Sequence, residues 1–302
     1  MSKQPYFVSL HHQIRLDENL PALGPIDADA AALISGAAGV LMPKYGSPTR
    51  YRQVARMARS HFPRLAARYA YRGKARQTAL FRALAIPHPR TVIYQTPGDA
   101  ATELKNKPSP IPLPFVLKGD SGGGGSAVFP IRCLEECMEC LTRLPRDEPV
   151  LVQEWIENSG RDLRVVVMGH QVVSYFRVGG DAFYNNVSKG ARIDFDLLPE
   201  TQQKGRRQAR ALAQGLGIDL AAFDIMFPAC GGESLVVEIN FLFGRKGLGG
   251  LKGYERLFRR AILDWMQDAL SGSYHQPTGV VQNRLPSLTA FSSRAGSVRF
   301  SQ

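Results

Sequence analysis

The chain has 302 residues, 44% of them hydrophobic, and a formal net charge of +12 at pH 7. This length and composition predict a globular protein of one to three domains. Four cysteines in a chain this long exclude a disulfide framework, and no stretch is long and apolar enough to predict a bilayer span. Because no targeting segment is recognisable, we expect a protein of the reducing cytoplasm with no membrane partner.

The positive charge is concentrated in one region. Between Ala30 and Gly98 there are twelve Lys and Arg residues and no Asp or Glu, which leaves 26 basic residues against 26 acidic ones elsewhere. Such a field attracts polyanions, so an acidic partner, nucleic acid or nucleotide phosphates are candidates. Arg52, Arg56 and Arg59, on the outer side of a predicted helix, are the candidate contacts for an acidic partner. A solvated helix face without a partner explains the same pattern equally well.

Hydrophobic periodicity and turn residues predict the elements in chain order. We expect a strand at 37–42, a helix opened by Ser47-Pro48, a helix at 74–85, a β-rich segment at 91–94, a Pro-rich loop at 97–114, strands at 114–118 and 127–131, a helix at 132–144, a strand at 150–156, a hairpin of 162–168 and 171–178, a helix at 201–215, strands at 220–227 and 234–240, and a helix at 254–270.

Two of these strands carry polar residues where a buried strand would continue with apolar ones. Glu238 and Asn240 are separated by one residue, so their side chains point to the same face of a strand. A hairpin through Gly231-Gly232 would bring Asp224 beside them. Carboxylate and amide oxygens suit a hard cation such as Mg²⁺ when phosphates supply the remaining ligands. An exposed hairpin face with ordinary polar residues is the alternative.

A lysine and a glycine run suggest a phosphate site. Lys118 ends an apolar strand and is followed by four glycines, from Gly122 to Gly125. Glycines let backbone N–H groups approach phosphate oxygens, and the lysine supplies a positive charge. The order of residues is not that of a P-loop, and a flexible linker would have the same composition.

Taken together, the motifs over roughly residues 73 to 270 resemble the ATP-grasp superfamily, particularly its RimK-like and glutathione-synthetase-like carboxylate–amine ligases. The motifs are Lys74-x3-Thr78, Pro114 to Lys118 with Gly122 and Gly125, Gln153-Glu154-Trp155-Ile156, Gly160 to Arg164, Asn186-x-x-Lys189-Gly190, and Asp224 with Glu238 and Asn240. The resemblance implies an α/β (α+β) protein with the ATP-grasp fold. Two α+β subdomains, 73–155 and 156–270, would grip ATP, after a small basic α/β domain at 1–72 and before a mobile tail or loosely docked arm at 271–302.

The resemblance also implies a set of ligand contacts. The residues that it places around ATP are Lys74, Lys118, Gly122, Gly125, Gln153, Glu154, Ile156, Asp162 and Arg164. The two lysines and the glycine loop would contact phosphates, the hinge 153–156 would read adenine through its backbone, and Asp162 would hold the ribose hydroxyls. Asn186 and Lys189 would lie beside the γ-phosphate. Asp224, Glu238 and Asn240 would bind Mg²⁺ or Mn²⁺.

The activity implied is the ATP-dependent joining of a carboxylate substrate to an amine substrate, with a small molecule or a peptide tail as the alternatives. ATP converts the carboxylate to an acyl phosphate, and this transfer needs charge neutralisation and alignment more than covalent help from the protein. An amine then attacks to give an amide, ADP and phosphate. Arg177 is the candidate for holding the acyl phosphate and the later oxyanion; an ordinary surface strand end is its alternative.

One departure from the family pattern bears on the acceptor. After Asn240 the family usually has a small residue and then Pro-Gly, whereas this chain reads Phe241-Leu242-Phe243-Gly244. A nucleotide-binding interaction or regulatory protein with a degenerate site therefore stays as a second hypothesis. Related ligases often pair as homodimers or tetramers, but no interface pattern is visible in this sequence.

Three cysteines show the spacing of a radical-SAM iron–sulfur site. Cys133, Cys137 and Cys140 fall at i, i+4 and i+7 with Leu141 and Leu144. One face of an amphipathic helix gives the same spacing, and such a cluster needs its thiolates on a loop that wraps one iron. We therefore expect a helix at this position.

Overall fold

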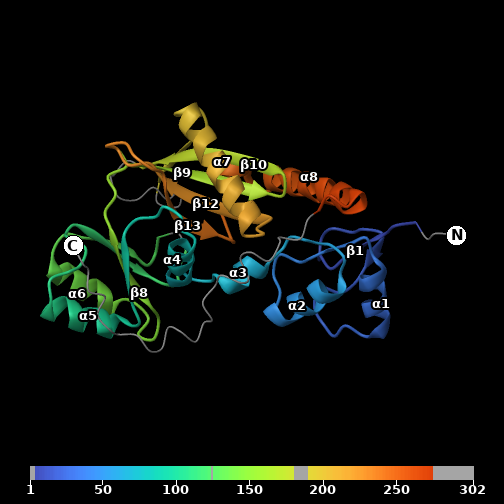
Figure 1. Ribbon diagram of the computed structural model, residues 1–302, viewed down its shortest axis with the longest axis horizontal. Helices are drawn as coiled ribbons and strands as arrows, with labels where there is room; N and C mark the ends of the chain where they lie inside the picture. The colour runs from blue at the N-terminus through green and yellow to red at the C-terminus, as the bar shows by residue number, and fades with distance from the viewer. Residues whose placement is uncertain (1–3, 124, 180–189, 275–302) are drawn as a thin grey trace.

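The computed structural model describes residues 4–123, 125–179 and 190–274. These residues form three sheets, two of four strands and one of five. Figure 1 shows the N-terminal domain at one end of an elongated molecule and the helices α5 (Pro97–Asn106) and α6 (Leu134–Thr142) at the other. Among the described helices, none combines the length and the apolar character needed to cross a bilayer.

The N-terminal domain is a parallel sheet with helices, as predicted for the lead domain. Its elements are β1 (Phe7–Ser9), β2 (Glu18–Asn19), α1 (Ala28–Gly36), β3 (Gly39–Leu41), α2 (Pro48–Met57), β4 (His61–Phe62) and α3 (Ala66–Ala70). The strand order is β2-β1-β3-β4, with every neighbouring pair parallel. Helix α2 begins where the sequence predicts, because the Ser47 side chain accepts a hydrogen bond from the Arg50 N–H and Pro48 occupies the first turn.

The second sheet is antiparallel and carries the predicted glycine loop. Its elements are α4 (Lys74–Ala83), β5 (Thr91–Tyr94), α5 (Pro97–Asn106), β6 (Phe115–Gly119), β7 (Val128–Ile131), α6 (Leu134–Thr142) and β8 (Val150–Glu154). The strand order is β5-β8-β6-β7. The glycine loop joins β6 to β7, so it connects two strands, as predicted. Cys137 and Cys140 lie in α6, with Cys137 fully buried, which confirms the predicted helix.

The Pro-rich loop predicted at 97–114 is wrong over its first half, because 97–106 form α5. The helix has ordinary start signals. Thr96 accepts a hydrogen bond from the Asp99 N–H, and Pro97 and Asp99 occupy the first turn. Ala100 and Leu104 are buried against the second sheet, in one core with Ile131 and Cys137. The prolines of 108–114 belong to the connection that follows.

The third sheet positions most of the candidate site. Its elements are β9 (Arg161–Met168), β10 (Gln171–Val178), β11 (Arg192–Asp194), α7 (Pro199–Gly215), β12 (Leu220–Met226), β13 (Leu235–Asn240), the 3-10 turn η2 (Lys246–Leu248) and α8 (Gly250–Ser271). The strand order is β11-β10-β9-β12-β13 with antiparallel neighbours. The hairpin predicted from Asp224 to Asn240 is therefore present as β12 and β13.

The two faces of this sheet are buried differently. One face packs on α7 and α4 through a core that includes Leu163, Val165 and Phe223. The other face packs on α8 and on the lead domain, in a core that joins Val166 to Phe62 and Trp265. On this second face β9 presents Asp162, Arg164, Val166 and Met168 in turn. Helix α8 covers the apolar half with Val166 and Met168 and leaves the charged half with Asp162 and Arg164 uncovered. The uncovered half is where a ligand can bind.

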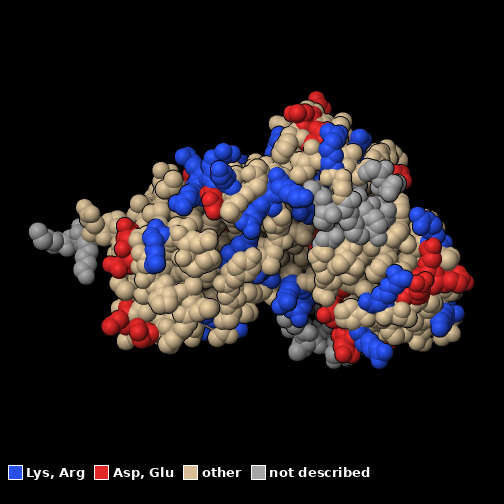
Figure 2. All heavy atoms as spheres, turned by 180° about the vertical axis from the view of Figure 1, so that it is seen from behind, with Lys and Arg blue, Asp and Glu red and all other residues tan. Residues whose placement is uncertain are grey.

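The basic stretch of the lead region divides into buried and exposed side chains. Arg64 pairs with Asp219, which directly precedes β12 (Leu220–Met226), whereas Arg52, Arg56 and Arg59 are exposed. Figure 2 shows Lys and Arg side chains gathered across the middle of one face, with Asp and Glu mostly toward its margins. The acidic partner stays a prediction.

The last described residue, Tyr274, packs against the body of the protein. Beyond α8, the Tyr274 hydroxyl donates a hydrogen bond to Asp219 at 2.7 Å and lies 3.2 Å from the His61 carbonyl oxygen. The predicted tail lies outside the described residues from position 275 onward.

Candidate active site

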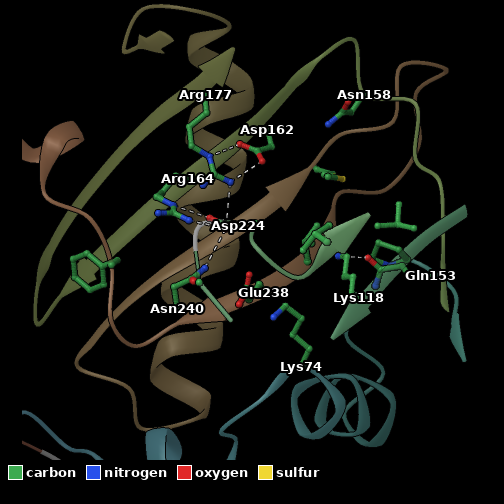
Figure 3. Close-up of a pocket in the computed structure, with 18 of the residues that line it drawn as sticks. Lys74, Lys118, Gln153, Asn158, Asp162, Arg164, Arg177, Asp224, Glu238 and Asn240 are labelled. Atoms are coloured by element: carbon green, nitrogen blue, oxygen red, sulfur yellow. Dashed lines mark hydrogen bonds and ion pairs between the residues drawn. The ribbon is translucent and has the colours of Figure 1, made fainter. Parts of the chain in front are cut away.

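A cavity of about 460 Å³ lies between the second and third sheets. Its lining includes every predicted site residue that the structure describes, from Lys74 of α4 to Asn240 of β13. Figure 3 shows Glu238 and Asn240 between two arginines on one side and Lys74, Lys118 and Gln153 on the other. Asn186 and Lys189 lie outside the described residues, so their predicted place beside the γ-phosphate stays a prediction.

Strand register explains why the charged residues meet. Arg177 of β10 is paired with Asp162 of β9, and Arg164 of β9 with Asp224 of β12. Asp224 is in turn paired with Glu238 of β13. Side chains at paired positions share a face, so these residues form one polar stripe across four strands. We refer to these five residues together with Asn240 as the charged stripe.

Arginine–carboxylate pairs hold the charged stripe in place. Arg177 donates to both carboxylate oxygens of Asp162, at 2.7 Å and 2.6 Å. Arg164 does the same to Asp224, at 2.8 Å and 2.7 Å, and the Arg177 guanidinium lies 3.2 Å from Asp224. Arg177 is only 4% exposed. The alternative of an ordinary surface strand end is therefore wrong. The ribose role predicted for Asp162 competes with this ion pair and stays a prediction.

The residues present fit a hard cation. Burial alone would raise the pKa of Asp224, but the charges of Arg164 and Arg177 outweigh it and lower the pKa to about 2. The carboxylate is therefore ionised at neutral pH. Asn240 donates its amide N–H to Asp224 at 3.1 Å, which leaves its carbonyl oxygen for another contact. With the Glu238 carboxylate also lining the cavity, two or three oxygens can serve a cation whose other ligands are phosphates and water.

Gln77 fixes the strand that carries Glu238 and Asn240. This buried side chain of α4 accepts a hydrogen bond from the Ile239 N–H at 2.8 Å and donates to the Ile239 carbonyl at 2.9 Å. It thereby saturates the backbone of the residue between the two candidate ligands. The sequence reasoning missed Gln77, because nothing local shows that it reaches a strand 162 residues away.

The opposite wall of the cavity carries the two lysines. The Lys118 ammonium donates to Gln153 at 2.5 Å, and that of Lys74 lies 3.4 Å from the carbonyls of Asp120 and Gly122. Burial lowers the pKa of Lys118 to about 8, although the charges of Glu238 and Asp224 act in the opposite direction. Phosphate oxygens placed here would be neutralised by the lysines on one side, and on the other side by a cation held at Asp224, Glu238 and Asn240.

The hinge predicted to read adenine borders the same cavity. Glu154 exchanges contacts with Arg90: its N–H donates to the Arg90 carbonyl, and its carboxylate accepts from the Arg90 N–H. Its side chain is therefore turned to the backbone, while Trp155 and Ile156 line the cavity. Apolar lining from Val116 and Met226 suits the flat faces of a base.

Two further lining residues were missed by sequence reasoning. Asn158 is buried just after the hinge, and Tyr175 sits opposite Arg164 on β10. Asn158 lies in a connecting segment with no periodic pattern. Tyr175 is indistinguishable in the sequence from an ordinary core aromatic.

Comparisons with known proteins agree with this site. The sequence signature of the RimK-like ATP-grasp domain matches residues 71–254, well over half of the chain. The chain belongs to the RimK-like ATP-grasp family. Family membership confirms the predicted ATP-grasp fold and the ligase class, and it implies the use of ATP with a carboxylate and an amine.

Curated relatives of the family are similar at a moderate level. A "Probable alpha-L-glutamate ligase" from Enterobacter sp. (strain 638) is 28% identical over 69% of this chain and 67% of its own length. A second "Probable alpha-L-glutamate ligase", from Rhodopirellula baltica, is 27% identical over 65% of this chain and 47% of its own length. The human "N-acetylaspartylglutamate synthase A" is 28% identical over 51% of this chain and 39% of its own length. The chain thus spans two thirds of the first relative and less than half of the other two.

Solved structures share the fold. A RimK domain ATP-grasp protein from Sphaerobacter thermophilus superposes with a TM-score of 0.53 at 18% identity, covering 85% of this chain and 98% of its own. D-alanyl-alanine synthetase A from Vibrio cholerae gives the same TM-score of 0.53 at 14% identity, over 78% and 77% of the two chains. At these identities the likeness establishes the fold alone.

Proposed function

We propose that this chain is an ATP-dependent carboxylate–amine ligase that forms an amide through an acyl-phosphate intermediate and releases ADP and phosphate. The observation that carries the proposal is the charged stripe facing Lys74 and Lys118 across one cavity. A transferring phosphoryl group is anionic on every oxygen, so it needs fixed positive charge on more than one side. The two lysines supply that charge from one wall. On the opposite wall the arginines are paired with Asp162 and Asp224, so a cation held by Asp224, Glu238 and Asn240 would supply the rest.

The arginines are suited to the second half of the reaction. Arg164 and Arg177 are held by carboxylates on neighbouring strands, so their guanidinium groups are already positioned before substrate binds. They can hold the acyl phosphate and then the oxyanion that forms when the amine nitrogen bonds to the carbonyl carbon. Collapse of that oxyanion breaks the bond from carbon to phosphate oxygen, and phosphate leaves. Glu238 and Asn240, with Asp224, would hold Mg²⁺ or Mn²⁺, which neutralises phosphate charge.

The relatives suggest the amine. Two of them are named as glutamate ligases and one as an N-acetylaspartylglutamate synthase, so we propose glutamate as the amine substrate of this chain. The carboxylate would then belong to a small molecule or a peptide end.

The experiment is ADP release measured with ATP, Mg²⁺, L-glutamate and a panel of carboxylic acids that includes N-acyl amino acids and short peptides. We expect one class of acid to stimulate ADP release at least tenfold. Glu238→Gln should lower the stimulated rate about 100-fold or more without changing the melting temperature, because it removes a cavity-lining carboxylate that forms no ion pair within the described residues. Glu233→Gln, at an exposed position, is the control.

Nucleotide binding without stimulated ADP release in any combination would instead support the regulatory hypothesis. Unchanged turnover in Glu238→Gln would contradict the proposed metal contact.

A further inference from the structure

A lysine of the lead domain lies against an aromatic side chain that lines the cavity. The Lys44 ammonium lies 5.3 Å from the ring centroid of Phe243 and 5.0 Å from that of Tyr254. Phe243, together with Gly244, Lys246 and Gly247, lines the cavity on the side away from the hinge. Lys44 follows β3, some 200 residues earlier in the chain than its aromatic partners.

Two more cations stand beside Lys44. The Arg245 guanidinium lies 5.8 Å from the Tyr254 ring, and that of Arg68 lies 5.8 Å from the Tyr45 ring. Arg68 also donates a hydrogen bond to the Lys44 carbonyl oxygen. We refer to Lys44, Arg68 and Arg245 as the cation cluster.

The cation cluster lacks a negative partner among the residues that the structure describes. None of the ion pairs found there involves any of the three side chains. Burial lowers the pKa of Lys44, and the charges of Arg245 and Arg68 lower it further. Lys44 and Arg68 are half-buried and Arg245 is exposed. Gathering like charges around the half-buried Lys44 costs free energy, and the rings offset only part of that cost. An anion bound among the three would remove the repulsion.

The position of the cluster narrows the choice of anion. Nucleotide phosphates would be bound by Lys74, Lys118 and the glycine loop, which line the cavity on the other side of Glu238 and Asn240. The cation cluster lies beyond Asn240, next to the segment 241–247 that follows β13. An anion there belongs to the second substrate.

We propose that Lys44, Arg68 and Arg245 bind a non-reacting carboxylate of an acidic substrate, so that the lead domain selects a dicarboxylic amino acid. This inference rests on the proposed function and names the residues that would recognise the acidic substrate. It also gives a role to the sequence after Asn240, where this chain departs from the pattern of its family. Phe243 and Arg245 belong to that segment and build the cluster with the lead domain.

The test compares acidic substrates with their amides. L-glutamate, L-aspartate, glutamine and isoglutamine are titrated by calorimetry into protein saturated with a non-hydrolysable ATP analogue, and KM values are measured by ADP release. The protein variants are Lys44→Met, Lys44→Arg and Arg245→Gln, with Lys252→Met on the exposed face of α8 as the matched control.

We expect wild-type protein to favour a dicarboxylic amino acid over one of its amides at least tenfold. Lys44→Met and Arg245→Gln should each raise Kd and KM for the acid tenfold or more, with the affinity for the nucleotide analogue unchanged. Lys44→Arg should retain most of the preference, and Lys252→Met all of it.

Two outcomes would overturn the inference. Unchanged Kd for the acids in both variants would exclude the cluster as the carboxylate site, whether or not the protein turns over. Equal affinity of the wild-type protein for the acids and their amides would also exclude a site that recognises the side-chain carboxylate. Absence of turnover with intact, cluster-dependent binding would instead count against the proposed function alone.

Discussion

At the scale of single residues, the site depends on the pairing of each buried charge with an opposite charge. Arg177 bridges Asp162 and Asp224, so one guanidinium neutralises parts of two carboxylates. The sequence made Arg177 a candidate for holding the acyl phosphate but did not show its carboxylate partners, because they become neighbours through strand register and not through spacing along the chain. The closeness of Asp224, Glu238 and Asn240 could be predicted, because alternation along one strand and the glycine turn between the two strands are visible in the sequence. Their role as metal ligands stays a prediction.

Removing Arg177 tests whether the buried carboxylates need its positive charge. Arg177→Met should lower the free energy of unfolding by about 3–5 kcal/mol, because it leaves Asp162 buried without its countercharge. Adding Asp162→Asn should recover part of the loss, with a coupling free energy of about 1 kcal/mol or more. The measurement is chemical denaturation followed by circular dichroism.

Arg192→Gln is the control for that series, since Arg192 pairs with Asp194 but is 67% exposed, and it should change stability by less than about 1 kcal/mol. If Arg177→Met and Asp162→Asn changed the free energy of unfolding additively, the two side chains would not be energetically coupled, which would contradict this account.

Lys118 predicts a pH dependence of nucleotide binding. Its pKa of about 8 means that the free protein loses this charge as the pH rises through 8, whereas bound phosphates favour the charged form. Binding of MgADP near pH 8 should therefore take up a proton, and the affinity should fall up to about tenfold from pH 7 to pH 9. Calorimetry in buffers of different ionisation enthalpy measures the proton directly.

Lys118→Arg stays charged throughout this range and should bind MgADP without the proton uptake. If the wild-type protein and Lys118→Arg took up the same number of protons on binding MgADP, the proton would be bound by a group other than Lys118.

At the scale of elements, helix α4 and strand β13 form one unit. Lys74 at the start of α4 faces the cavity, and Gln77 one turn later holds Ile239 between Glu238 and Asn240. The helix and the strand were each predicted from the sequence, but their contact was not. The contact depends on a polar side chain buried between segments far apart in the chain. Helix α5 escapes prediction for a different reason, because Thr96 and Pro97 are typical of loops but begin a helix here.

The substitution Gln77→Ala tests the contact between α4 and β13. It would leave the Ile239 N–H and C=O buried without partners, so the free energy of unfolding should fall by about 1–3 kcal/mol. Because the strand that carries Glu238 and Asn240 would lose its anchor, the Mg²⁺ concentration for half-maximal activity should rise as well.

Gln203→Ala on the exposed side of α7 should change stability by no more than about 0.5 kcal/mol. A destabilised Gln77→Ala protein with an unchanged Mg²⁺ requirement would limit Gln77 to a role in folding.

At the scale of the whole molecule, the lead domain and the third sheet share a core. Phe7, Leu41 and Phe62 pack with Trp265 of α8, and the Trp265 indole donates to Ser60 at 2.8 Å. The sequence predicted a lead domain at 1–72 but gave no sign of this packing, because the contacting residues lie some 200 positions apart. The domain boundaries, the acidic partner at Arg52, Arg56 and Arg59, the oligomeric state and the cytoplasmic location stay predictions.

The shared core also places the lead domain against the cavity wall, where Lys44 lies over the ring of the lining residue Phe243. Lys44 reaches Phe243 only because β3 and α8 pack on the same face of the third sheet. The family resemblance could be drawn from motifs between residues 73 and 270, and it is confirmed by the match over 71–254. What selects the substrate could not be drawn from it, because that depends on how the lead domain docks.

The proposed chemistry has a direct isotopic test. The acid that stimulates ADP release is labelled with ¹⁸O in its carboxylate, and the released phosphate is examined by ³¹P NMR. Formation of an acyl phosphate requires one carboxylate oxygen to leave with the phosphorus, so each amide formed should be matched by one ¹⁸O in phosphate. Amide formation with unlabelled phosphate, or ADP release without any amide, would contradict the account.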